Sequence, residues 1–291
     1  MKIAVGIATM GRKETLSEAV AELCLQSRPA DRILICATKE EDIDRARLQN
    51  FGLPVEIMID TPGSSHQRNV ILSRLDDADA VMFMDDDFIA CPDYLASLEA
   101  LLTAHSDIVV LTARPLADGA RNAGIPLAEA RTINAASVAP VRPSLEETYS
   151  GYGCNMAVRL APLRATGVRF NENLPLYGWL EDLDVSRRLA PYGRIMLSDA
   201  LRGVHLAIKT GRSSGLRFGY SQVANPIALY RDGIIPVSQL LLHVGRPMLA
   251  NLLRAAQPEP YVDRRGRLKG NLLAVRDLFL SKCDPRAIIH L

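Results

Sequence analysis

The chain has 291 residues, of which 48% are hydrophobic and 23% charged, a composition typical of a globular protein with a sizeable core. The formal net charge is +1, so no overall basic field indicates nucleic acid as a partner. The charge is nevertheless uneven. Residues 201–291 contain 14 Lys and Arg against 5 Asp and Glu, whereas residues 1–200 contain 20 against 28. We therefore expect a basic C-terminal third attached to an acidic body.

The cysteines are odd in number and none has the spacing of a zinc site: Cys24, Cys36, Cys91, Cys154 and Cys283. They indicate a reducing compartment without a disulfide framework. The N-terminus runs directly into a strand pattern, so we expect no signal peptide. The longest uncharged run of the C-terminal region, 233–245, is shorter than the ~20 apolar residues of a spanning helix. These features predict a cytoplasmic protein.

Strand and helix patterns alternate through the N-terminal half. Strands are expected at 2–9, 32–37, 55–60 and 80–84, and helices at 14–26 and 65–75. This alternation predicts an α/β fold with a mainly parallel sheet flanked by helices. Ligands of such sheets bind at the carboxyl ends of the strands, where we look for the functional residues.

The second half of the chain is less regular. Residues 115–148 lack a clear period and are interpreted as a loop or small insertion, whereas a helix is expected at 180–189. From 237 to 256, apolar residues share one helical face, which Pro247 should kink or divide into two helices. We expect a body of residues 1–232 and a helical appendage of residues 233–291.

The strongest local signal is a run of acids at the end of a buried strand, Asp85, Asp86 and Asp87. Strand alternation places Asp85 and Asp87 on the same side. Their mutual repulsion is offset best by a hard divalent cation such as Mg²⁺ or Mn²⁺, which prefers oxygen ligands. The alternative is an acidic turn that caps the following helix, near Pro92.

A second group of acids opens the helix at 180–189. Glu181, Asp182 and Asp184 lie at its start, and basic residues lie at its end, an arrangement that by itself only complements the helix dipole. Trp179, the only tryptophan of the chain, lies just before these acids. An apolar wall beside a carboxylate suits a sugar ring and a general base that takes a proton from a hydroxyl.

Two further segments carry weaker signals. His205 is a candidate metal ligand, although a lone histidine is more often structural, and Lys209 and Arg212 beside it could neutralise phosphate or form a solvated basic loop. The segment GSSHQRN at 63–69 opens a helix and contains Arg68. A helix N-terminus and an arginine both favour phosphate, but a plain N-capped helix would explain the same residues.

Taken together, these segments resemble the family-two inverting glycosyltransferases of bacterial polysaccharide type, which have the GT-A fold. VGIATMGR resembles the first strand of that family, and MDDD resembles its metal-binding Asp-x-Asp signature. GYGCNMAVR at 151–159 is similar to the segment that leads to the acceptor site, and LEDLD is similar to the motif that holds the catalytic base. The resemblance extends from residue 2 to about residue 225.

The resemblance implies specific roles for individual residues. Asp182 would be the general base, Asp87 and His205 the metal ligands, and Asn155, Trp179 and Glu181 would lie at the acceptor. The implied contacts to the nucleotide sugar are Thr9, Arg12, Asp42, Arg68, Asp85 and Asp86. The second strand ends in CATKEEDID rather than in the usual Asp/Asn-rich turn, so Glu40, Glu41 and Asp42 are alternative contacts to the base.

The implied reaction is metal-assisted transfer of a sugar, with inversion, from a nucleotide-diphosphate donor to a hydroxyl of a saccharide or lipid-linked acceptor. Mn²⁺ or Mg²⁺ would be the cofactor. One alternative is a nucleotidyltransferase acting on sugar phosphates, which would need a Gly-rich basic loop where TMGRKET stands. The other is a non-catalytic nucleotide-sugar-binding protein, against which the presence of Asp182 argues.

The basic C-terminal third has two interpretations. Its apolar helix and surrounding arginines are typical of a segment that docks on an anionic membrane surface, here the inner face of the cell membrane. The same helix could instead pack on the sheet or form a homodimer interface.

Overall fold

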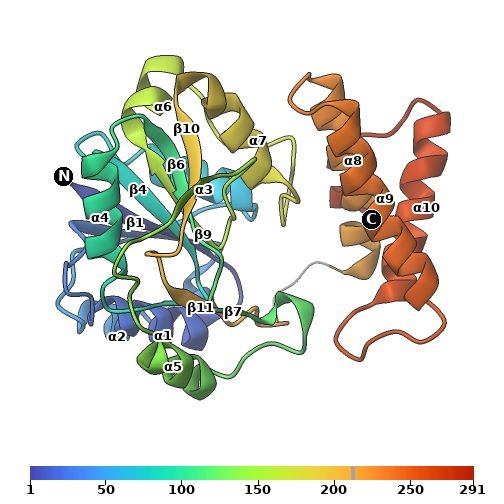
Figure 1. The fold of residues 1–291 in the computed structure, drawn as a ribbon. Coiled ribbons are helices and arrows are strands. Elements are labelled where there is room, and N and C mark those ends of the chain that lie inside the picture. Colours follow the sequence, from blue (N-terminus) through green and yellow to red (C-terminus); the bar gives the residue numbers. More distant parts are fainter. Residues whose placement is uncertain (211–213) are drawn as a thin grey trace.

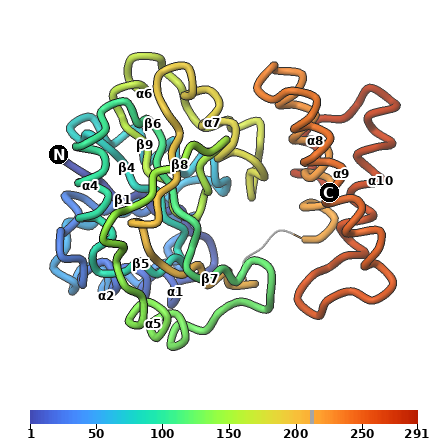
Figure 2. The backbone as a smooth tube through the Cα atoms, in the orientation of Figure 1, coloured from blue at the N-terminus to red at the C-terminus, as the bar shows by residue number. Residues whose placement is uncertain are grey.

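The strands predicted for the N-terminal half assemble into one large sheet. The computed structural model describes residues 1–210 and 214–291, and its strands lie together in the body (Figures 1 and 2). The strand order of the large sheet is β3-β2-β1-β4-β9-β6-β10-β8. The strands in that order are Val55–Ile59, Arg32–Ala37, Ile3–Thr9, Ala80–Asp85, Asn155–Arg159, Ile108–Thr112, Arg194–Ser198 and Leu145–Glu147. β1 pairs in parallel with β2 and β4, whereas β9 runs antiparallel to both β4 and β6. The predicted, mainly parallel α/β sheet is confirmed.

Alternation along the buried strands divides the core into two layers. Ile3, Val5 and Ile7 of β1 face the layer formed by helices α1, α2 and α4 (Lys13–Leu23, Arg45–Gln49 and Tyr94–Ala104). Ala4 of the same strand faces the layer formed by α3, α6 and α7 (Ser64–Leu72, Leu160–Thr166 and Glu181–Leu189). β1 is therefore buried on both sides, as its uninterrupted hydrophobic sequence predicted.

The irregular segment 115–148 is more ordered than its sequence indicated. It contains strand β7 (Ala117–Asp118), a 3₁₀ turn (Gly119–Arg121), helix α5 (Leu127–Ala136) and strand β8. β7 joins β5 (Phe88–Ala90) and β11 (Gly203–His205) in a small second sheet. Ala130 and Ile125 of this insertion pack against Ile89 and Val204, so tertiary burial organises a segment that has little periodicity of its own.

The C-terminal residues form a helical unit beside the body (Figure 1). It consists of α8 (Gly215–Arg231), α9 (Val237–Arg254), α10 (Arg264–Phe279) and a final 3₁₀ segment (Pro285–His290). α8 shares a core with α10, so as packed the unit begins at α8. α9 continues through Pro247 as one helix, so the proline does not divide it into two, although it has no N–H for the carbonyl of His243.

The helical unit is anchored to the body next to α7. Leu229 and Ile235 pack with Leu180 and Leu183, and Asn225 Nδ2 donates to the carbonyl of Trp179 at 2.8 Å. Within the described ranges, 1–210 and 214–291, no helix is both long and apolar enough to cross a bilayer.

Candidate active site

The acidic run lies where β4 ends, at the carboxyl edge of the parallel strands. Asp86 and Asp87 form a turn and β5 follows directly, so these acids do not cap the next helix, which begins at Tyr94. Asp85, Asp87 and His205 each offer one ligand atom, and these atoms lie within 4.8 Å of one another. One oxygen of Asp87, Oδ1, is buried and accepts no hydrogen bond from the described residues. Burying a carboxylate oxygen without a hydrogen-bond partner costs free energy. This oxygen therefore fits the role of a cation ligand.

His205 is oriented toward these acids by its other ring nitrogen. Nδ1 lies 2.9 Å from Oδ1 of Asp118, which leaves Nε2 at 3.4 Å from Asp87 Oδ1 and 3.8 Å from Asp85 Oδ2. Burial disfavours the imidazolium, but the hydrogen bond to the Asp118 carboxylate and the nearby charge of Asp87 outweigh it and raise the pKa of His205. Likewise, burial would raise the pKa of Asp87, but the contact with His205 and the charge of Arg12 lower it.

Thr9 and Arg12, at the end of β1, bind the central acid of the run. Thr9 Oγ1 donates to Asp86 Oδ2 at 2.6 Å, and Arg12 donates to Asp86 Oδ1 at 2.8 Å. Arg12 also reaches Asp87 Oδ2 at 3.2 Å. Asp86 is not one of the three residues whose ligand atoms cluster within the described part of the chain. Burial raises its pKa, against the charge of Arg12.

Arg68 joins the metal strand to the acids of α7. Its guanidinium forms an ion pair with Glu181, donates to the carbonyl of Gly153 at 2.9 Å and lies 3.4 Å from Asp85 Oδ1. It is buried and packs over the rings of Phe83 and Phe170. Through Nη1 and Nη2, Arg68 therefore links the two acidic groups.

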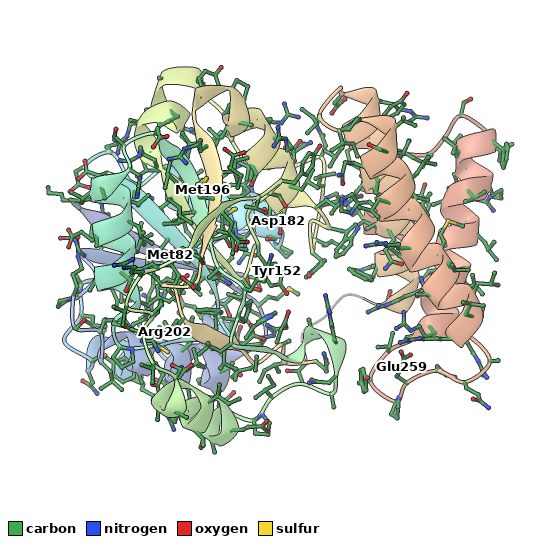
Figure 3. The ribbon with its side chains drawn as sticks, viewed as in Figure 1. Met82, Tyr152, Asp182, Met196, Arg202 and Glu259 are labelled. Carbon is green, nitrogen blue, oxygen red and sulfur yellow. The ribbon has the colours of Figure 1, made fainter. Side chains whose placement is uncertain are left out.

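Asp182 is held by backbone donors on both of its oxygens. Gly153 N donates to Oδ2 at 2.9 Å, and Leu183 N donates to Oδ1 at 2.8 Å. Asp182 is half-buried, whereas its neighbour Glu181 is buried. Burial raises the pKa of Asp182, opposed by these two hydrogen bonds. In Figure 3, Asp182 and Tyr152 lie on the side of the body that faces the helical unit.

The segment before α7 has an unusual backbone. Leu176, Gly178 and Leu180 all have positive φ angles, of 57°, 64° and 72°. Leucine rarely adopts this conformation, which costs of order 1–3 kcal/mol and is concentrated at functional sites. The segment presents Trp179, which stacks with Tyr177 and meets the ring of Phe218 on α8 at 5.3 Å. The indole Nε1 of Trp179 is buried and has no hydrogen-bond partner among the described residues.

The remaining predicted residues lie in different places. Asn155 is fully buried, and its Oδ1 accepts from Ala113 N at 2.8 Å, so it supports the backbone of the site and does not line its surface. Asp42 is buried and accepts from Thr38 Oγ1, whereas Glu40 and Glu41 are exposed. Lys209 Nζ donates to the carbonyl of Gly119, and Arg212 lies outside the described residues.

Sequence reasoning missed two residues of the site, Asp118 and Tyr152. Tyr152 OH donates to Asp118 Oδ2 at 2.9 Å, and its ring meets that of His205 edge-on. Burial would raise the pKa of Asp118, but the hydrogen bonds from His205 and Ala120 N lower it to about 2. Asp118 lies in the segment without periodicity, so only the Asp-Gly turn signal marked its position.

No protein-family model and no curated protein matches the chain. Among solved structures, it is similar to the mannosyltransferase PcManGT from Pyrobaculum calidifontis in complex with GDP-Man and Mn²⁺, with a TM-score of 0.60 and 15% identity over 99% of this chain and 85% of that chain. It is also similar to S. aureus TarS 1–349 in complex with UDP-GlcNAc, with a TM-score of 0.56 and 16% identity over 97% and 92% of the two chains.

A third similar structure is GalNAc-T7 with UDP, GalNAc and Mn²⁺, with a TM-score of 0.56 and 13% identity over 97% of this chain and 57% of that chain. At these identities the likeness concerns the fold. The chain therefore has the GT-A fold of these glycosyltransferases, as the motifs of its sequence predicted.

Proposed function

We propose that the protein is an inverting glycosyltransferase that uses a nucleotide-diphosphate sugar and a divalent cation, Mn²⁺ or Mg²⁺. The observation that carries this proposal is the cluster of Asp85, Asp87 and His205, with an unbonded, buried Asp87 oxygen. Two of the similar structures contain a nucleotide together with Mn²⁺. Bound at this cluster, the cation would neutralise the diphosphate as negative charge develops on it.

Helix α7 would supply the general base that activates the acceptor hydroxyl. Asp182 takes the proton of an acceptor hydroxyl, whose oxygen forms a bond to the anomeric carbon while the bond from that carbon to the diphosphate oxygen breaks. The two backbone hydrogen bonds hold its carboxylate in place, and its partial exposure lets an acceptor reach it. Glu181 is occupied by Arg68, which makes it a poorer candidate for the base.

The positions of the other predicted residues suggest which of them contact the nucleotide-sugar donor and which contact the acceptor substrate. Thr9, Arg12, Asp42 and Arg68 surround the carboxyl ends of β1 and β2 and the start of α3, where the nucleotide of a GT-A fold would lie. Trp179, whose side chain is partly exposed, would provide an apolar wall for a saccharide or lipid-linked acceptor.

Product analysis tests this function against its enzymatic alternative. With a nucleotide sugar, Mn²⁺ and no acceptor, a glycosyltransferase slowly releases the nucleoside diphosphate. A nucleotidyltransferase would instead release pyrophosphate from a nucleoside triphosphate and a sugar phosphate. A non-catalytic binding protein would bind the nucleotide sugar and release neither product.

We also propose that the outer face of α9 docks the enzyme on an anionic membrane surface. Leu240, Val244 and Met248 face the core of the helical unit. The exposed part of α9, here called its outer face, nevertheless includes five large apolar residues: Val237, Leu241, Leu249, Leu252 and Leu253. Arg246 on α9 and Arg265 and Lys269 on α10 are exposed, in a region of net positive charge. Exposed leucines beside basic side chains suit anionic lipid, at about 1 kcal/mol per charge near the surface.

A further inference from the structure

The 3₁₀ turn that follows β7 lies next to His205, one of the three residues of the metal cluster. Asp118, the last residue of β7 and the N-cap of this turn, accepts a hydrogen bond through Oδ1 from Nδ1 of His205 at 2.9 Å. An ionised carboxylate only accepts hydrogen bonds, so Nδ1 carries the proton of this contact. The imidazole ring has only two nitrogens, and the contact therefore determines that Nε2 is the one that faces Asp85 and Asp87.

The Asp118 carboxylate is itself held firmly. Oδ2 accepts from Tyr152 OH at 2.9 Å, and Oδ1 also accepts from Ala120 N at 2.9 Å. The next residue must be small, because a Cβ added at Gly119 would lie 2.2 Å from the carbonyl oxygen of Leu206. The turn is thus packed directly against the end of β11, the strand that carries His205.

Two contacts brace the same turn from further away. Lys209 Nζ donates to the carbonyl of Gly119 at 2.8 Å, and Tyr261 OH, from the helical unit, lies 3.3 Å from the carbonyl of Arg121. The position of Asp118 is therefore set by the body, by the segment after β11 and by the helical unit together.

We propose that Asp118 is the positioning residue of the metal site: through Nδ1 it fixes the ring of His205 so that Nε2 is presented to the cation beside Asp85 and Asp87. This inference rests on the divalent cation of the proposed function. A carboxylate behind a metal-binding histidine fixes its ring orientation and raises its basicity as a ligand. Removal of such a partner typically lowers metal affinity 10–100-fold.

Titration of the protein with Mn²⁺ in the presence of UDP or GDP, followed by electron paramagnetic resonance, measures this effect without catalysis. We expect Asp118→Ala to raise the Mn²⁺ Kd about 10–100-fold. Asp118→Asn keeps an acceptor oxygen and should fall between Asp118→Ala and the wild type. Tyr152→Phe removes only the other contact of Asp118 and should change the Kd least. Thermal unfolding of each variant reports whether the fold is retained.

A spectroscopic signature separates positioning of the ligand from a general structural effect. Bound Mn²⁺ should show electron-spin-echo modulation from an imidazole nitrogen in the wild type. This signal should be absent in His205→Ala and weakened in Asp118→Ala. An unchanged Kd and nitrogen signal in Asp118→Ala would overturn the proposal. If the wild type itself bound no Mn²⁺ with either nucleotide, the metal site of the proposed function would fail first, and this inference with it.

Discussion

Asp182 and Glu181 are adjacent carboxylates with different surroundings. Glu181 is buried and paired with Arg68, whereas Asp182 is half-buried and accepts hydrogen bonds from two backbone donors. We expect Asp182→Asn to lower kcat by about 10²–10⁴-fold, because the amide fits the same space but cannot accept the proton. The donor Kd should hardly change, which titration calorimetry measures.

The matched variant is Glu181→Gln. It removes one charge from the pair with Arg68, so it should weaken the packing of α7 and reduce kcat less than Asp182→Asn does. An inactive Glu181→Gln together with an active Asp182→Asn would assign the base to Glu181 instead.

The pH dependence of kcat/KM distinguishes the same two residues. A general base acts in its ionised form, so the rate should fall as the pH falls through the pKa of that base. Burial raises the pKa of Asp182 above its ordinary value, so the acid limb should lie above that of an exposed aspartate. Burial raises the pKa of Glu181 to about 8, against the charge of Arg68. An acid limb near pH 8 would therefore point to Glu181.

At the scale of elements, α8 and α10 approach each other through glycines. A Cβ at Gly270 would lie 2.1 Å from the carbonyl oxygen of Leu216, and a Cβ at Gly219 would lie 2.1 Å from that of Arg267. Two helices that touch backbone to backbone leave no room for a side chain. The close packing of the helical unit therefore depends on these two positions.

Gly270→Ala should lower the free energy of unfolding by about 1–3 kcal/mol, as overpacking does, although alanine is the better helix former. Gly245→Ala is the matched control, because this glycine of α9 has no atom within 4 Å of an added Cβ. It should raise the free energy of unfolding by up to ~1 kcal/mol. Urea unfolding measures both values, and equal effects at the two sites would contradict the glycine contact.

At the scale of the whole molecule, the sequence predicted the layers of the body better than the insertion at 115–148. Buried strands such as β1 and β2 are largely apolar and bounded by turn residues, so their positions followed from local pattern. α5 and β7 are held by contacts with β5 and β11, which are distant in sequence. No local pattern specifies such contacts.

The candidate site likewise contains residues that sequence motifs predicted and residues that only the fold brings together. Asp85, Asp87 and His205 belong to ordered motifs and do come together. Asp118 reaches His205 across 87 positions of sequence, and only the fold places the two side chains side by side. Burial also decides roles that a motif leaves open, as it does for Asn155, which lies inside the protein.

The membrane proposal concerns the whole molecule as well. The wild type should sediment with anionic vesicles and not with neutral ones, and less so at high salt because screening weakens the charge contribution. Leu241→Gln combined with Leu249→Gln should abolish sedimentation. Leu25→Gln, at a leucine of the body that is 62% exposed against 67% for Leu241, is the matched control and should not.

The competing occupant of this face is a second copy of the chain. Light scattering of the wild type and of the double variant detects it. A dimer that the double variant disrupts, with vesicle binding unchanged, would assign the outer face of α9 to dimerisation instead.

The central claim, metal-dependent transfer from a nucleotide sugar, is tested most directly by calorimetric titration with UDP-, GDP- and dTDP-sugars in the presence of Mn²⁺. We expect the wild type to bind at least one donor and to lose that binding in excess EDTA. Asp87→Ala should weaken it strongly and abolish release of the nucleoside diphosphate, since the buried acid is lost from the cation site. Asp76→Ala, at an exposed acid ahead of β4, should behave as the wild type does. Full activity of Asp87→Ala, or of the wild type in EDTA, would contradict the account.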